Sequence, residues 1–210
     1  MKDKIIAIEG AQNPLKSVLK LKAKKVKFPL SEEDQGIIKI MKELLFSLDG
    51  VCLAAQQIDI NKNIATVYIP KSVSLLRDNT VEYSMHVIIN GTYEPIESEG
   101  ICSDFEGCYS VKTIYSKVQR YNAIKVTYQN EEGEKISKIE RGFYARVLQH
   151  EIDHLNGLLI TDRLTTDSIQ GTFTEMLNLR RESLYEEKRD LFDQLIKQKA
   201  MINEIKRENI

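Results

Sequence analysis

The chain has 210 residues, with 30 lysines and arginines against 31 aspartates and glutamates, and a formal net charge of -1 at pH 7. This balance argues against a protein whose main task is to bind DNA or other nucleic acid. The length allows one domain with a sizeable core plus an appendage. No apolar run approaches the ~20 residues of a membrane span, and the first residues do not resemble a signal peptide, so we expect a cytoplasmic protein.

Lysines crowd the segment from Lys16 to Lys27. They favour an edge strand or a solvated face that the charges protect from association. The alternative is a basic patch that contacts the ribosome or another RNA.

The first helix is predicted from about Ser31 to Leu48. Ser31 and Asp34 have the spacing of a capping box. Apolar residues recur at helical spacing, namely Ile37, Ile38, Met41, Leu44, Leu45 and Leu48. Gly50 is a natural stop, so the stretch GVCLAAQQ that starts there should leave the helix as a loop or strand.

The middle of the chain favours β-structure. Residues 64–70 (IATVYIP) and 83–91 (YSMHVIING) are short runs of β-branched or aromatic residues bounded by turn residues. Residues 123–140 read as two strands around NEEG, which predicts a hairpin.

A second helix is predicted from about Arg141 to Asn156, closed by Gly157. Its apolar positions should keep one face in the core: Tyr144, Val147, Leu148, Ile152 and Leu155.

The tail after about Thr166 predicts a long amphipathic helix. Leucine or isoleucine falls on a seven-residue repeat at Leu177, Leu184, Leu191 and Ile205, and the charges are balanced. Such a helix either packs back on the domain or pairs with a second chain, and the sequence leaves this choice open.

The second helix contains the sequence HEIDH. His150 and His154 are four residues apart and therefore share one helix face, where two imidazoles can bind one metal ion at ~2.0–2.1 Å. Glu151 follows the first histidine, where such motifs place a general base beside the metal-bound water. The alternative is a coincidental match on a solvated helix.

A catalytic site of this kind needs a third protein ligand. His86 lies in an alternating strand and is more typical of an ordinary sheet histidine. Cys108 is the better candidate, because Gly107 before it permits close approach of a ligand and a thiolate suits iron, zinc or cobalt. Cys102 has no such setting. An odd number of cysteines does not indicate a disulfide framework.

Three segments together resemble the signature motifs of the peptide deformylases, in the same order. They are GVCLAAQQ (Gly50–Gln57), EGCYS (Glu106–Ser110) and HEIDH (His150–His154). The resemblance covers roughly Leu15 to Leu164. It implies a metal-dependent amidase that removes the formyl group from formylmethionine on nascent chains.

The resemblance also implies a role for each matched residue. Cys108, His150 and His154 would be the metal ligands, with water in the fourth place and Glu151 as general base and then acid. The Gln57 amide and the Tyr109 backbone N–H would stabilise the oxyanion. Backbone from Gly50, Val51, Cys52 and Leu53, and from Glu106 and Gly107, would hold an extended peptide. Asp153 would orient its surroundings, for instance by pairing with Arg120 or Arg146, or else form a simple surface salt bridge.

One divalent ion per chain is expected, Fe²⁺ first, with Zn²⁺, Ni²⁺ or Co²⁺ as substitutes. The predicted fold is α+β, with antiparallel sheets packed around the HExxH helix, an N-terminal helix and a long C-terminal helix. Residues 1–165 would form the catalytic domain and residues 166–210 an amphipathic helical extension, through which a homodimer is one open prediction.

Two residues depart from the family pattern. Cys52 stands where the first motif usually has its second glycine, and would be strained if its backbone needed a positive φ. Tyr109 replaces the usual leucine and should reshape the entrance. These changes leave two alternatives open: a related metallohydrolase with another substrate, and a catalytically silent scaffold or ribosome-associated protein.

Overall fold

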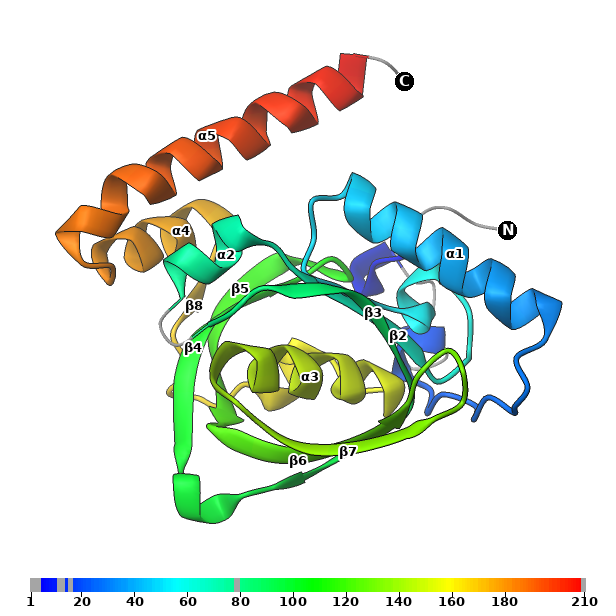
Figure 1. Cartoon of the computed structure of the whole chain (residues 1–210). Helices are drawn as coiled ribbons and strands as arrows, with labels where there is room; N and C mark the ends of the chain where they lie inside the picture. The colour runs from blue at the N-terminus through cyan, green and yellow to red at the C-terminus, as the bar shows by residue number, and fades with distance from the viewer. Residues whose placement is uncertain (1–4, 11–13, 15–16, 78–79, 209–210) are drawn as a thin grey trace.

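The computed structural model describes residues 5–10, 14, 17–77 and 80–208. In this part of the chain, two antiparallel sheets enclose one central helix, α3, which spans Gly142–Leu155 (Figure 1). The larger sheet has the strand order β1-β2-β3-β6-β7 and the smaller sheet the order β4-β5-β8. The predicted α+β arrangement around the HExxH helix is confirmed.

The strands of the larger sheet are β1 Cys52–Ala54, β2 Ile64–Ile69, β3 Tyr83–Pro95, β6 Ala123–Gln129 and β7 Lys135–Arg141. Those of the smaller sheet are β4 Ile101–Cys108, β5 Val111–Tyr121 and β8 Gln170–Gly171. The other α-helices are α1 Glu32–Ser47, α2 Lys71–Leu76, α4 Phe173–Glu182 and α5 Glu186–Glu208. Short 3₁₀ turns are η1 Ile8–Gly10, η3 Val18–Lys20, η4 Ala55–Ile58, η5 Glu97–Glu99 and η6 Ile160–Arg163.

Helix α1 begins as its sequence predicts. The Ser31 side chain accepts a hydrogen bond from the Asp34 backbone N–H, and the Asp34 carboxylate accepts one from the Ser31 backbone N–H. The end differs in one detail, because the left-handed residue after the helix is Asp49, with φ 49°, and not Gly50. Gly50 instead lies against the side chain of Tyr109 at the candidate functional site.

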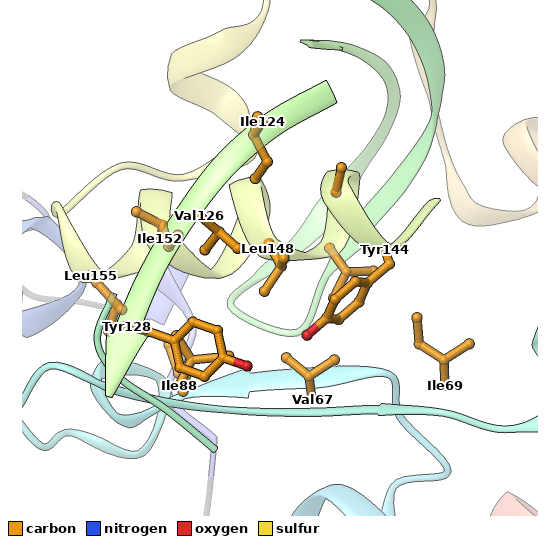
Figure 2. Close-up of a cluster of buried hydrophobic side chains, with 14 of the residues drawn as sticks. Val67, Ile69, Ile88, Ile124, Val126, Tyr128, Tyr144, Leu148, Ile152 and Leu155 are labelled. Atoms are coloured by element: carbon orange, nitrogen blue, oxygen red, sulfur yellow. The ribbon is translucent and has the colours of Figure 1, made fainter. Parts of the chain in front are cut away.

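The first strands of the larger sheet are covered on both faces. On the outer face α1 packs with Ile37, Met41 and Leu45 against residues such as Ile64 and Ile89. On the inner face α3 interdigitates with β2, β3 and β6, as Figure 2 shows for Leu148, Ile152, Val67, Ile88 and Val126. Because β2 is covered on both sides, nearly all of its residues are buried and its sequence does not alternate between apolar and polar residues.

The predicted hairpin is formed by β6 and β7. Their register runs from Ala123 opposite Arg141 to Gln129 opposite Lys135. The turn contains Gly133 with φ 84°, a conformation that favours glycine.

Helix α3 is buried on every face from Tyr144 to Leu155, which the sequence did not predict. The apolar positions face the larger sheet as expected. The remaining face carries buried polar residues, namely Arg146, Gln149, His150, Glu151, Asp153 and His154. Gly157 closes the helix with φ 77°, and a Cβ there would lie 2.7 Å from the Lys20 carbonyl oxygen.

The C-terminal extension is two helices and not one. α4 ends at Glu182, with Ser183 as its C-cap, and the chain turns before α5, the long helix, begins at Glu186 (Figure 1). Among the described side chains of this part, the buried apolar residues are Met176, Leu184 and Phe192. Of the seven-residue repeat, Leu184 is therefore buried and Leu177 and Leu191 are partly buried, while the side chain of Ile205 lies outside the described part. The described helices include none with the length and apolar character needed to cross a membrane.

The lysine-rich segment forms no extended edge strand in its described part. Lys20 lies in η3 and pairs with Asp162. Lys24 forms a single parallel bridge with Lys62. Lys16 lies outside the described residues.

A substitution of Leu148 tests the packing of α3, because this side chain is fully buried between the helix and the larger sheet. We expect Leu148→Ala to lower the free energy of unfolding by about 3 kcal/mol, from lost burial and the cavity left behind. Leu21→Ala is the control, since Leu21 is 43% exposed, and should change stability by less than about 0.5 kcal/mol. Chemical denaturation measures both, and equal losses would contradict this packing.

Candidate metal centre

The structure brings together the three residues that the sequence proposes as metal ligands. His150 and His154 lie one turn apart on α3, with ring centroids 4.9 Å apart. Cys108, the last residue of β4, has its Sγ 3.3 Å from His154 Nε2. One ligand atom from each residue lies within 4.8 Å of the others, and all three side chains are buried. A tight, buried set of two imidazoles and one thiol fits a transition metal ion.

The ring nitrogens of His150 and His154 are also suited to metal binding. His150 Nδ1 is 3.1 Å from a carboxylate oxygen of Glu106, which leaves Nε2 for a metal. Burial and the nearby His150 lower the pKa of His154 well below its usual value, so its ring is neutral, the form that binds metals.

Glu106 is the centre of a buried ionic network. Its two oxygens accept hydrogen bonds from Arg120 at 3.1 and 3.0 Å, and one also accepts from Arg146 at 2.6 Å. Burial alone would raise the pKa of Glu106, but His150 and Arg120 outweigh it and hold that pKa well below its usual range. The carboxylate therefore stays ionised. The sequence assigned only the backbone of Glu106, to the substrate, and missed the contact of its side chain with His150.

Asp153 extends this network away from the metal ligands. Its carboxylate accepts from Arg120 and from Arg163, whose Nε lies 2.9 Å away. Of the two predicted partners, Arg120 is therefore observed, whereas Arg146 binds Glu106. Asp153 is only 2% exposed, so the alternative of a surface salt bridge is wrong.

Glu151 lies beside the cluster. It is 1% exposed, and neither of its carboxylate oxygens has a hydrogen-bond partner among the residues that the structure describes. Burial raises the pKa of Glu151 to about 7. A carboxyl group held in this way can both take up and release a proton near neutral pH.

Cys52 is the first departure from the family pattern, and its backbone is not strained. It lies in β1, and it is not among the described residues that have a positive φ. Its Sγ, a His150 nitrogen and a Glu151 oxygen lie within 4.8 Å of one another. Burial and the Glu151 carboxylate raise the pKa of the Cys52 thiol, so it stays neutral. Cys52 therefore narrows the space beside Glu151.

Gln57 is oriented toward the cluster by its own backbone surroundings. Its side-chain oxygen accepts a hydrogen bond from the Ala54 N–H at 2.8 Å. The amide nitrogen is thereby directed at Cys108 Sγ, 3.7 Å away, and at Ser110 Oγ, 3.4 Å away. An N–H donor thus points at the Cys108 side of the cluster.

The cluster opens into two adjoining cavities between β1 and β4, which are edge strands of the two sheets. A cleft of about 430 Å³ runs from Cys108 and His150 outward past Tyr109 and Tyr115. A pocket of about 190 Å³ lies on the other side and is lined by Phe105, Phe143 and Val147, with Arg77 and Arg146. Val51, Cys52, Gly107 and His150 line both cavities.

Tyr109, the second departure, crosses from one wall of the cleft to the other. A Cβ placed on Gly50 would lie 2.7 Å from the Tyr109 hydroxyl oxygen. Glycine at position 50 therefore leaves room for the tyrosine in this position. Leu53, in contrast, is fully buried and lines neither cavity, so its side chain is not available to a ligand.

The rejected candidates lie elsewhere. His86 Nε2 is 2.7 Å from the Tyr144 hydroxyl oxygen, as an ordinary sheet histidine would be. Cys102 is exposed. Sequence reasoning missed Arg163, and it missed Tyr115 and Phe173 in the cleft. One signal for the network is Arg120, which alternates in β5 with the buried Val118 and therefore occupies an inward position.

Comparisons with known proteins agree with this site. The family model of polypeptide deformylase matches residues 6–169. Peptide deformylase 2 of Rickettsia conorii is 35% identical over 174 residues, covering 80% of this chain and 85% of that protein. The Synechocystis peptide deformylase is 37% identical over 150 residues, covering 70% and 74%.

Solved structures give the same result. The Met-Ala-Ser-bound class I type b peptide deformylase from Acinetobacter baumannii has a TM-score of 0.65 at 30% identity, covering 78% of this chain and 100% of that one. The Thermotoga maritima enzyme has a TM-score of 0.61 at 34% identity, covering 77% and 97%. By its sequence, its fold and the arrangement of its three matched motifs, this chain belongs to the polypeptide deformylase family.

Proposed function

We propose that this chain is a peptide deformylase, which hydrolyses the N-terminal formyl group of formylmethionyl nascent peptides. The observation that carries the proposal is the buried set of Cys108, His150 and His154 next to the unpartnered Glu151. The relatives named peptide deformylase support it, as does a related structure bound to Met-Ala-Ser, the peptide that deformylation of formyl-Met-Ala-Ser would release.

Cys108, His150 and His154 would hold one divalent metal ion, with Fe²⁺ first and Zn²⁺, Ni²⁺ or Co²⁺ as substitutes. When bound, such an ion supplies Lewis-acid chemistry, because it acidifies a water molecule and polarises the formyl carbonyl. Glu106 would fix the tautomer and orientation of His150.

Glu151 would move the protons of the reaction. As a base it takes a proton from the water that attacks the formyl carbon, and as an acid it gives that proton to the leaving amine of methionine. This role is supported by the two carboxylate oxygens of Glu151, because neither accepts a hydrogen bond from the described residues. Hydrolysis then yields formate and a free N-terminus.

Gln57 would stabilise the negative charge that develops on the formyl oxygen. Its amide nitrogen points at the metal ligands, and the backbone N–H of Tyr109, directly after Cys108, would be the second donor. Donors of this kind typically contribute about 3–4 kcal/mol to transition-state stability.

The peptide would lie in an extended conformation between the edge strands β1 and β4, since free strand edges offer backbone hydrogen bonds. Backbone of Gly50–Leu53 and Glu106–Gly107 supplies them. The methionine side chain would enter the 190 Å³ pocket, where Phe105, Phe143 and Val147 offer apolar contact.

A related hydrolase of another acyl peptide is the second candidate, and Cys52 is the observation that favours it, because its side chain lines both cavities. Cytoplasmic location, ribosome contact through the Lys16–Lys27 segment and pairing through the extension stay predictions.

Formate release tests the proposal directly. Anaerobically purified protein loaded with Fe²⁺ should release formate from formyl-Met-Ala-Ser, as measured by a coupled formate assay. Acetyl-Met-Ala-Ser, assayed in parallel, distinguishes the second candidate. Metal-loaded protein that releases acetate but no formate would overturn the first proposal in favour of the second.

Glu151→Gln separates catalysis from metal binding, because glutamine keeps the size of the side chain and removes its basicity. We expect formate release to fall by roughly 10²–10⁴-fold, while elemental analysis still finds one metal ion per chain. Glu187→Gln on α5 is the exposed control and should retain full activity. Loss of metal from Glu151→Gln would instead give Glu151 a structural role.

Asp153→Asn tests the ionic network, because it removes the charge that pairs with Arg120. Arg120 in turn binds Glu106, which contacts His150, so the substitution should loosen the position of the His150 ring. The dissociation constant for Zn²⁺, measured by chelator competition, should rise by about 10–100-fold. Asp193→Asn removes an exposed carboxylate that pairs with Arg181 and should leave that constant unchanged. Equal constants for both variants would refute the positioning role of Asp153.

A further inference from the structure

The chain continues beyond the family match in direct contact with the substrate cleft. The match ends at residue 169, and β8 follows at once. Gly171 pairs with Tyr115 and Gln170 with Ser116 on β5. The Ile169 carbonyl also accepts a hydrogen bond from the Lys117 N–H at 2.8 Å. The extension thus begins as an additional strand of the sheet that carries Cys108.

Helix α4 is fixed to the domain along its length. Its first turn is closed by a capping box between Thr172 and Glu175. Met176 in the middle is buried, and at the far end Arg180 donates to the Leu76 carbonyl at 2.8 Å and pairs with Asp104 at 3.6 Å. Figure 1 shows α4 beside α2, next to the strands of the smaller sheet. A helix held to the domain in its middle by Met176 and at its far end by Arg180 keeps its side chains in fixed positions.

Phe173, the first residue of α4, lines the 430 Å³ cleft. Its ring lies 5.0 Å from the ring of Tyr115, tilted by 56°. Tyr115 in turn covers Gly107, where an added Cβ would lie 2.7 Å from the tyrosine ring. Gly107 precedes Cys108, so an aromatic wall leads from the metal ligands outward to Phe173.

Phe173 is 52% exposed although Met176, one turn later, is buried. Exposed apolar surface has no stabilising role by itself, but a rigid aromatic surface in a cleft is suited to bind apolar groups. The opposite wall is formed by Asp49–Cys52. The cleft therefore offers an apolar wall on the side of the extension.

We propose that Phe173 and Tyr115 form a subsite for an aromatic or large apolar side chain in one of the two residues that follow the formylmethionine. This inference rests on the proposed function. The reacting group must lie near Cys108, His150 and Gln57, and the methionine side chain takes the smaller pocket. The two cavities diverge at Gly107 and His150, so the rest of the peptide must leave through the larger cleft, past Tyr115 and Phe173.

The experiment compares kcat/KM for formyl-Met-Phe-Ser, formyl-Met-Ala-Phe and formyl-Met-Ala-Ser with metal-loaded protein. Wild type should prefer at least one phenylalanine peptide over formyl-Met-Ala-Ser by about 3- to 10-fold, the range that aromatic pairs provide. Phe173→Ala should reduce this ratio to near one, mainly through KM. Phe173→Leu, which keeps an apolar side chain, should give an intermediate ratio.

Leu179→Ala is the matched control, because Leu179 lies on the same helix, is 42% exposed and does not line the cleft. It should keep the wild-type ratio. No preference in wild type, or an unchanged ratio in both Phe173 variants, would overturn the inference while formate release upholds the deformylase. Release from none of the three peptides by wild type would instead contradict the proposed function.

Discussion

The site depends on one buried carboxylate, that of Glu106. It is shared by His150, Arg120 and Arg146, and so it joins β4, β5 and α3 around a single charge. Charges removed from water are costly unless each is paired and hydrogen-bonded. The network meets this condition, since Asp153 and Arg163 complete the pairing of Arg120. The hydrogen bonds that offset the cost of burying these charges also fix the orientation of the His150 imidazole.

This network explains why α3 is buried on all sides. One face packs against the larger sheet as any amphipathic helix would. The other face is polar and yet excluded from water, because its residues are paired with one another and with the strands. The exceptions on this face of the described chain are the two carboxylate oxygens of Glu151 and the Nδ1 atom of His154, which are buried without a hydrogen-bond partner. A group held at such a cost to stability is typical of catalytic sites, where perturbed pKa values serve the reaction.

Local signals in the sequence were sufficient for most elements and for the histidines of the candidate metal site. The capping box at Ser31, the turn around Gly133 and the i, i+4 spacing of the histidines each involve residues within one turn or hairpin. The long C-terminal helix that the sequence predicted is observed as α5, whereas the separate helix α4 before it was not predicted, because the periodicity of the leucines continues across the break at residues 183–185.

The sequence by itself therefore determined the type of chemistry, through residues whose spacing or motif is readable along the chain. The tertiary structure alone decided the partners of Glu106, Asp153 and Arg146, because these pairs join positions 10 to 44 residues apart whose meeting depends on how strands and α3 pack. It also decided that Phe173 lies at the cleft. No local pattern encodes that position, since it follows from the pairing of β8 with β5.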